Sequence, residues 1–517
     1  MRWPGGRASS PLAAPLPLQG PGVLRQRYVR RAPPSADAVP AVQTVPAVQT
    51  VPAVQSEAPP VPERAVRKGL LSSSALVPLF IAVQILTQLA LLWEVLAPLR
   101  MIFRIFSFGA SLLLLALVPG QRLRHPALPF ALAAMAVTAL NLFHPQTSSL
   151  MAGAAQLGIQ FAVLGPLIWV TRLRIDAQVL RRTLGLLFLF NAASAALGVL
   201  QVYAPGKFQP AMSVIIESMG EAYTQSLQFV GPTGERIFRP FGLTDTPGGA
   251  TTGAFYAVLL GSGFLLSEKG GLIRLLSVGG IFLGIVCLYL CQVRASAMML
   301  LVCMLAIVAV LAFNGRLLRM TKLIAVVGGF AVVGFGWAST MGGDAIVSRW
   351  NTLFEDQAGD VYYDNRGRFL DSALTAYLPE YPLGAGLGRY GMPNSYFGDN
   401  SDPSRPPLWV EIQWAAWVLD GGIFVLVLYP LALLATLFWS LRLASSKDDQ
   451  HEFWLWGSIL FGFNLGAIAI TFSYPFFMSQ TGMVFWLLNA ALFGAHHHAV
   501  HQARPPVPNA TLHAHRR

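Results

Sequence analysis

The sequence predicts an all-α integral membrane protein of about 12 transmembrane helices, with roughly 10–12 as the range that its apolar segments allow. Hydrophobic residues make up 54% of the 517 residues and charged residues only 12%, a balance too apolar for a water-soluble globule. The apolar residues are gathered into long runs rather than spread evenly. The apolar–polar alternation of transmembrane barrels is absent, so the runs are expected to be helices.

Each expected span is a largely uncharged run whose length suits a membrane helix, since about 20 residues cross a bilayer core of about 30 Å. In chain order the runs lie near residues 74–96, 101–118, 126–143, 150–171, 183–203, 250–267, 272–291, 296–313, 321–340, 410–439, 453–473 and 475–494. Lys and Arg beside spans are retained on the cytoplasmic side. Basic residues such as Arg172 and Arg316 occupy every second connection, so both termini are expected in the cytoplasm.

Two polar segments flank the membrane domain, which is expected to cover residues 74–494. Residues 1–73 are basic and rich in proline, and they repeat Val-Pro-Ala-Val-Gln between residues 39 and 55. This composition predicts a disordered cytoplasmic arm; alternatively, its arginines suit an anionic lipid surface or a partner protein. Residues 495–517, rich in His and Arg, are expected to form an unstructured cytoplasmic tail.

The charge and the motifs of the chain argue against several function classes. The net charge of +12 resides in loops and tails rather than in a folded basic domain, so no nucleic acid partner is expected. Cys287, Cys291 and Cys303 lie inside expected spans and are interpreted as packing residues. The sequence has no Walker motif, helical His-Glu-x-x-His or nucleophile elbow, so neither a metal nor another cofactor is expected.

Alternation of the spans from a cytoplasmic start leaves two long outward segments, residues 204–249 and 341–407. The second contains several arginines and not one lysine. Arginine presents a planar fork of donors that matches phosphate oxygens, and it is less costly to desolvate than lysine. A lipid-linked phosphate or pyrophosphate is therefore a suitable ligand at this face. The alternative is that the arginines pair with neighbouring acids.

Arg294 stands at the outward end of the seventh run. An ionisable group near membrane depth usually faces a polar cavity, although a long side chain also reaches the interface by extending along the helix. Both interpretations stay open on the sequence alone.

Three short blocks resemble the superfamily of O-antigen ligases and polysaccharide polymerases. They are Arg239-Pro-Phe-Gly-Leu-Thr-Asp-Thr-Pro247, Gln292-Val-Arg-Ala-Ser-Ala297, and Arg366-Gly-Arg-Phe-Leu-Asp-Ser-Ala-Leu374 followed by Tyr381-Pro-Leu-Gly-Ala-Gly-Leu-Gly388. In that family a Phe-Gly stretch precedes a span of small residues, and a Ser-Arg pair caps the following helix. A large outward loop then carries arginine and Pro-x-x-Gly-x-Gly. The resemblance covers residues 239–440.

The resemblance implies a metal-independent, inverting glycosyltransferase of the C-type membrane fold, with its large outward loop between the ninth and tenth helices. Such enzymes move a glycan from undecaprenyl pyrophosphate to an acceptor hydroxyl on the outer face of the bacterial inner membrane. A ligase uses lipid A core as acceptor, and a polymerase uses another lipid-linked glycan. By match of motif, Arg239, Arg294 and Arg366 or Arg368 would bind the pyrophosphate. Arg389 of the same loop is expected to join them.

One departure from the family concerns the catalytic base. Family members usually place a histidine eleven residues ahead of a Glu-x-Gly element. Here Asp420-Gly-Gly422 occupies that element, and the residue eleven positions before Gly422 is Glu411. A carboxylate is thus expected to replace imidazole as the group that takes the acceptor proton. The alternatives are a Glu411 paired with Arg405, or a divergent or inactive member.

Two rival classes stay open. A secondary transporter of a small solute commonly has about 12 spans, but the two halves of this chain show no likeness. Mannosyl- and arabinosyltransferases of the C-type fold resemble one another in acidic pairs in the first outward loop, where this chain has only Glu94 with Arg100. A polymerase is preferred to a ligase because the ligase-like histidine is missing. The N-terminal arm could also dock polysaccharide-assembly proteins.

Overall fold

A computed structural model describes residues 73–502 with several gaps. The gaps are residues 121–122, 212–219, 231–233, 269–270, 352–357, 400, 402–405 and 448–450. The expected N-terminal arm up to residue 72, and residues 503–517 of the expected tail, lie outside the described residues.

Helices dominate the described residues, and eight of them are long and apolar enough to cross a membrane. These are η2 and α2 over Glu94–Leu117, α4 and η4 over Leu150–Arg172, α5 (Ala177–Tyr203), α10 (Gly271–Cys291), α11 (Arg294–Phe313), the Leu317–Thr340 part of α12, α17 (Gln413–Ala444) and α18 (Phe453–Ile470). Three shorter apolar helices are α1 (Leu76–Ala90), α3 with η3 (Leu128–Phe143) and α9 (Ala250–Leu266). This architecture is that of a mostly helical membrane protein.

Each of the twelve expected runs contains a helix, and the last is α19 (Gln480–Gln502). The number that cross a membrane stays a prediction. The expectation of an unstructured tail from residue 495 is wrong for residues 495–502, which continue α19. No proline interrupts the chain between Gly494 and Pro505, so nothing in the sequence stops the helix there.

Side chains cap the first turns of two helices. The Ser149 hydroxyl accepts a hydrogen bond from the Ala152 amide at 3.0 Å at the start of α4. The Asp176 carboxylate accepts one from the Val179 amide at 2.7 Å at the start of α5. Each bond satisfies an amide that has no partner within its helix, and it fixes where the helix begins.

Small residues allow α5, α9 and α10 to pack closely around Phe188. A Cβ atom at Gly261 of α9 would lie 3.2 Å from the Phe188 ring, and one at Gly280 of α10 would lie 2.9 Å from it. Lipid provides no hydrophobic drive between helices, so this close approach is the source of their association. Cys287 and Cys291 of α10 are buried and unlinked, as expected of packing residues.

His125, in the connection before α3, is 1% exposed. Its Nδ1 atom accepts a hydrogen bond from the Ala127 amide at 3.2 Å, and its ring centre lies 4.8 Å from that of Phe493. Burial lowers the pKa of His125 to about 3, so the imidazole is neutral at physiological pH.

The first expected outward segment, residues 204–249, contains a small sheet. It holds α6 (Pro205–Phe208), α8 (Glu221–Ser226) and an antiparallel hairpin of β1 (Gln228–Val230) and β2 (Arg236–Phe238). Phe229 pairs with Ile237, and both side chains are buried. The expected all-α fold is thus corrected by one hairpin within the described residues.

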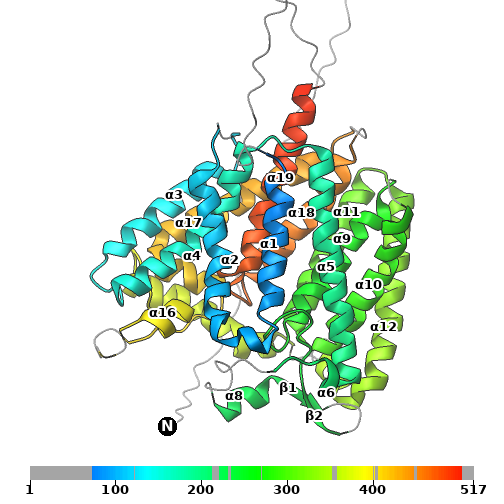
Figure 1. Ribbon diagram of the computed structural model, residues 1–517, viewed down its shortest axis with the longest axis horizontal. Coiled ribbons are helices and arrows are strands. Elements are labelled where there is room, and N and C mark those ends of the chain that lie inside the picture. Colours follow the sequence, from blue (N-terminus) through cyan, green and yellow to red (C-terminus); the bar gives the residue numbers. More distant parts are fainter. Residues whose placement is uncertain are drawn as a thin grey trace, which may run out of the picture. The chain divides into compact units, whose positions relative to one another are not determined.

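The second expected outward segment, residues 341–407, is largely helical rather than a loop. Helix α12 (Leu317–Asn351) continues beyond its expected end at residue 340. Residues 358–380 then form one helical stretch comprising α13 (Ala358–Tyr362), η5 (Tyr363–Gly367), α14 (Arg368–Ser372), η6 (Ala373–Tyr377) and α15 (Leu378–Glu380), and α16 (Gly391–Phe397) follows. The turns η5 and η6 are π-helical, a form frequent at functional sites. Figure 1 shows α16 and the β1–β2 hairpin at the same end of the bundle.

Candidate functional site

Helix α17 is broken at Gly422, where the backbone turns to φ 57°. A Cβ atom at this position would lie 1.9 Å from the Pro382 carbonyl oxygen, so glycine is needed for the chain around Pro382 to approach. We call residues 341–407, which include Pro382, the outward segment after their expected orientation. The Ile423 amide donates to that oxygen at 3.0 Å, and the Ala385 amide donates to the Leu419 carbonyl at 2.8 Å. The chain around Pro382 therefore fills the break and satisfies backbone groups that the helix leaves unpaired.

Asp420 lies in α17 directly before this break and is 1% exposed. Its carboxyl oxygens accept hydrogen bonds from the Tyr390 hydroxyl at 2.8 Å, from Gln156 Nε2 at 3.2 Å and from Gln160 Nε2 at 2.5 Å. A buried carboxyl group needs such donors to replace lost water. Since the donors belong to α4 and to the outward segment, Asp420 joins both of them to α17.

The Tyr390 hydroxyl keeps its proton and donates a hydrogen bond in this network. Burial, followed by the charge and the hydrogen bond of Asp420, raises the pKa of Tyr390 well above its usual range. From the sequence, Asp420 is predicted only as the acid of the Asp420-Gly-Gly422 element. Its contacts to α4 and to the outward segment were not predicted. The signal that could have found them was an acid within an apolar run, with Gln156 and Gln160 one turn apart in another.

The expected base and one expected pyrophosphate ligand are in direct contact. Arg366 Nη1 donates to Glu411 Oε2, and the indole nitrogen of Trp409 donates to Glu411 Oε1 at 2.9 Å. The side chains of Arg366 and Glu411 are 38% and 26% exposed, so both reach solvent. Arg405, the alternative partner considered for Glu411, lies outside the described residues. The pair places a carboxylate that accepts protons beside a guanidinium that binds phosphate oxygens.

Arg368 is paired with Asp364 one turn away, and the two side chains are 65% and 58% exposed. An ion pair this exposed contributes little to stability, so an anion can displace Asp364 at small cost. Of the two arginines that the motif left open, Arg366 is the one that contacts Glu411.

Arg389 is 2% exposed and lies inside the outward segment rather than on its surface. Its guanidinium donates to the Gln146 side-chain oxygen at 2.7 Å and to the Pro406 carbonyl at 2.9 Å. These bonds fasten the segment to the connection between α3 and α4. Burial, and then the charge of Arg389, lower the pKa of nearby His144.

Arg239 follows strand β2 and lies near Cys291 at the end of α10. Its Nε atom is buried without a hydrogen-bond partner, and burial lowers the pKa of its guanidinium. Asp245, the acid of the same motif, is bound instead to Arg104 of α2 at 2.5 Å. None of the described acids forms an ion pair with Arg239, so its charge suits an anionic ligand.

Arg294 is the first residue of α11 and follows a strained corner. Gln292 has φ 56°, in the left-handed region that residues other than glycine seldom adopt. The N-terminal end of α11 adds its partial positive charge to that of Arg294, which is half-buried. Cys291, near Arg239, stands three positions before Arg294, so these two expected ligands belong to one corner of the fold.

The expected site residues thus fall into two groups. Arg239 and Arg294 belong to the corner between α10 and α11, whereas Glu411, Arg366 and Arg368 belong to the outward segment and the residues just before α17. Arg389 also lies in the outward segment, but it is buried and apart from the Glu411–Arg366 pair. No family model matches the chain, and a search of curated proteins found no similar one. The likeness to polysaccharide polymerases and ligases therefore rests on the short motifs alone.

Proposed function

We propose that the protein transfers a lipid-linked glycan from undecaprenyl pyrophosphate to an acceptor hydroxyl on the outward face of a bacterial inner membrane. The contact between Glu411 and Arg366 carries the proposal. It brings together, at a half-exposed point, a proton acceptor and a donor to phosphate oxygens, the two groups that metal-independent glycosyl transfer requires.

In the proposed reaction, Glu411 takes the proton of the acceptor hydroxyl while the hydroxyl oxygen attacks the anomeric carbon. The bond between that carbon and the pyrophosphate breaks, and the arginines stabilise the charge that gathers on the leaving group. Arg366 donates a hydrogen bond to Glu411 in the structure. A pyrophosphate that takes over Arg366 frees a carboxylate oxygen to act as the base.

We also propose that the site faces outward and that the protein is a polymerase. The acceptor is then a second lipid-linked glycan, and the product is a longer chain on a lipid carrier. In an O-antigen ligase the acceptor would be lipid A core. Comparing envelope glycan from cells with and without the protein distinguishes the two. A polymerase is expected to change chain length, whereas a ligase is expected to change the attachment of chains of unaltered length.

The decisive test uses purified protein in lipid vesicles with a lipid-linked glycan donor extracted from the parental cells. Glu411→Gln is expected to lose transfer, whereas Glu380→Gln, which alters an exposed acid of the same segment, keeps the parental rate. Transfer by Glu411→Gln at the parental rate would contradict the assignment of the base. Envelope glycan unchanged by deletion of the protein would contradict the function.

A secondary transporter is the alternative, and one observation favours it. Transporters bind solutes at broken helices near the bilayer midplane, and α17 is broken beside the buried Asp420. In this chain, however, backbone from the outward segment fills the break. Unchanged envelope glycan together with altered solute uptake in the deletion strain would support the transporter.

A further inference from the structure

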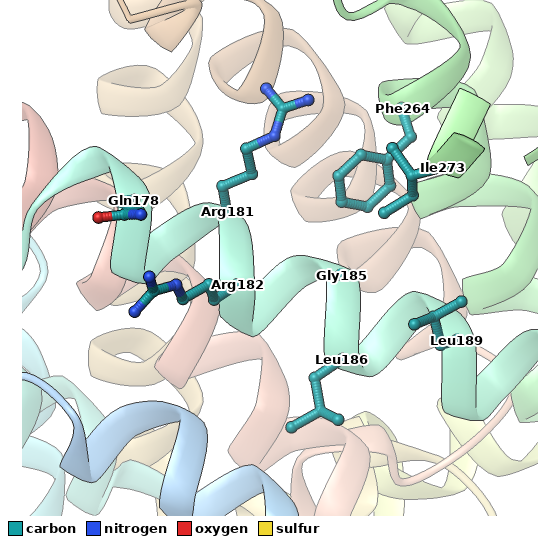
Figure 2. Close-up of a pocket in the computed structure, with 8 residues that line it drawn as sticks. All are labelled: Gln178, Arg181, Arg182, Gly185, Leu186, Leu189, Phe264 and Ile273. Carbon is teal, nitrogen blue, oxygen red and sulfur yellow. The ribbon is translucent and has the colours of Figure 1, made fainter. Parts of the chain in front are cut away.

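A groove of about 480 Å³ lies between the first half of α5 and the neighbouring α9 and α10, apart from the candidate site. Figure 2 shows the residues that line it. Arg181 and Arg182 of α5 lie at one end of the groove. Phe264 of α9 and Ile273 of α10 line it from the other side. The groove is polar at the arginine end and apolar along the rest of its length.

The arginine end carries an uncompensated positive charge. Arg181 is paired with Glu452 at 3.2 Å, so its charge is largely balanced. Arg182 is exposed, and none of the described acids forms an ion pair with it. Figure 2 shows its guanidinium on the same side of α5 as the side chain of Gln178, which adds a neutral hydrogen-bond donor. An anion with several oxygens fits these groups.

The floor of the groove is Gly185, and its lack of a side chain creates the hollow. A Cβ atom there would lie 3.7 Å from Ile273 Cδ1 and 3.8 Å from Phe264 Cζ, which is ordinary van der Waals contact. Alanine therefore fits with the groove still open. A leucine would fill the space over the floor.

The groove opens toward a surface that suits hydrocarbon chains. Leu189 of the groove is 46% exposed, and Leu272 and Leu275 at the start of α10 are 72% and 69% exposed. Both α5 and α10 are long and apolar enough to cross a membrane, so these side chains are expected to face lipid. Arg181 and Arg182, near the start of α5, then lie at the depth of lipid headgroups.

We propose that this groove binds one anionic phospholipid. Its phosphate is held by Arg182 and Gln178, and one acyl chain lies over Gly185 between Leu189 and Ile273. The charge of Arg182 selects an anionic headgroup, and the apolar floor selects a lipid over a free phosphate. The site is independent of the proposed glycan transfer.

The test measures lipid retention and affinity with the full-length protein. The protein is purified in a neutral detergent, and binding of phosphatidylglycerol, phosphatidylcholine and inorganic phosphate is measured by native mass spectrometry. The parental protein is expected to prefer phosphatidylglycerol and to ignore inorganic phosphate. Arg182→Gln is expected to weaken phosphatidylglycerol binding by about fivefold, the effect of one interfacial arginine. Gly185→Leu is expected to abolish it.

Two matched controls separate the groove from general effects. Arg174→Gln removes an exposed arginine just before α5 that is not part of the groove, and Gly185→Ala leaves the hollow open. Both are expected to bind phosphatidylglycerol as the parent does. Equal binding of phosphatidylcholine, competition by inorganic phosphate, or full binding by Gly185→Leu would each overturn the proposal. A change of oligomeric state in Gly185→Leu, with lipid binding unaltered, would assign the groove to a second copy of the chain.

Discussion

The hydroxyl of Tyr390 donates to Asp420 at 2.8 Å, and this bond ties the outward segment to the interior of α17. The two residues belong to different parts of the fold, and each is buried. The position of the catalytic candidates thus depends on a polar contact inside the bundle. Several expected outcomes follow from this contact and from those around it.

Tyr390→Phe is expected to destabilise the protein by about 1–3 kcal/mol, because it removes one donor from a buried carboxyl group. The ring is kept, so packing changes little. The measurement is thermal unfolding in detergent, together with protease cleavage within residues 381–412. Tyr396→Phe, which alters a tyrosine that is 38% exposed, is the control and should leave both unchanged. Equal stability of the two variants would show that the bond to Asp420 is not a structural anchor.

Gly422→Ala is expected to displace the outward segment from the break in α17. The added Cβ would lie 1.9 Å from the Pro382 oxygen, and the left-handed backbone adds roughly 1–2 kcal/mol of strain. Loss of transfer activity with a lowered melting temperature is the expected result. Gly328→Ala changes a helical glycine of α12 with open space around it, and it should be tolerated. A Gly422→Ala protein with parental stability would contradict the packing described for the break.

Arg366→Gln is expected to lower glycan transfer on the order of 10²–10³-fold, as removal of a donor to developing negative charge does in other enzymes. The lost interaction is one that strengthens as charge gathers on the leaving group, so the loss should persist at saturating donor. Arg368→Gln is expected to weaken donor binding only, since its partner Asp364 is exposed. Steady-state kinetics with a lipid-linked glycan separates these effects. Equal defects in the two variants would remove the distinction between the arginines.

Acid is expected to destabilise the protein through His125. The folded protein keeps this imidazole neutral down to about pH 3, whereas the unfolded chain binds a proton near pH 6.5. Stability is therefore complete above pH 6.5 and falls toward pH 3, by up to about 1.4 kcal/mol per pH unit. His125→Phe should flatten the melting temperature between pH 6.5 and 4.5. The exposed His501→Phe is the control, and it should follow the parental profile.

The sequence predicts the helices of this fold well and their breaks poorly. Each apolar run contains a helix, as expected, because the hydropathy of a run depends only on residues that are neighbours in the sequence. The break in α17 lies inside a single apolar run, and Gly422 adopts its conformation only because Pro382 packs against it. Two of the three donors to Asp420, Gln156 and Gln160, stand 264 and 260 residues away, and no local pattern connects them to it.

The expected site shows the same division. The motifs predict Glu411 and Arg366 as site residues. They stand 45 positions apart in the sequence, and the fold brings them into contact. Arg389 was predicted from its charge and its place in the loop. It is buried and bonded to Gln146, and it lies in the turns between α15 and α16. Sequence alone gives no direction to a side chain within a segment whose local structure it leaves open.

The filled break in α17 has a consequence for how the protein is made. A newly inserted α17 on its own would expose unpaired peptide groups to hydrocarbon at Gly422, which a bilayer tolerates poorly. The residues that cover them, around Pro382, are synthesised shortly before this helix, and in the proposed topology they cross the membrane first. With that topology, export of the preceding segment is coupled to stable insertion of α17, and mutations that delay folding outside the membrane are expected to appear as failures of insertion within it.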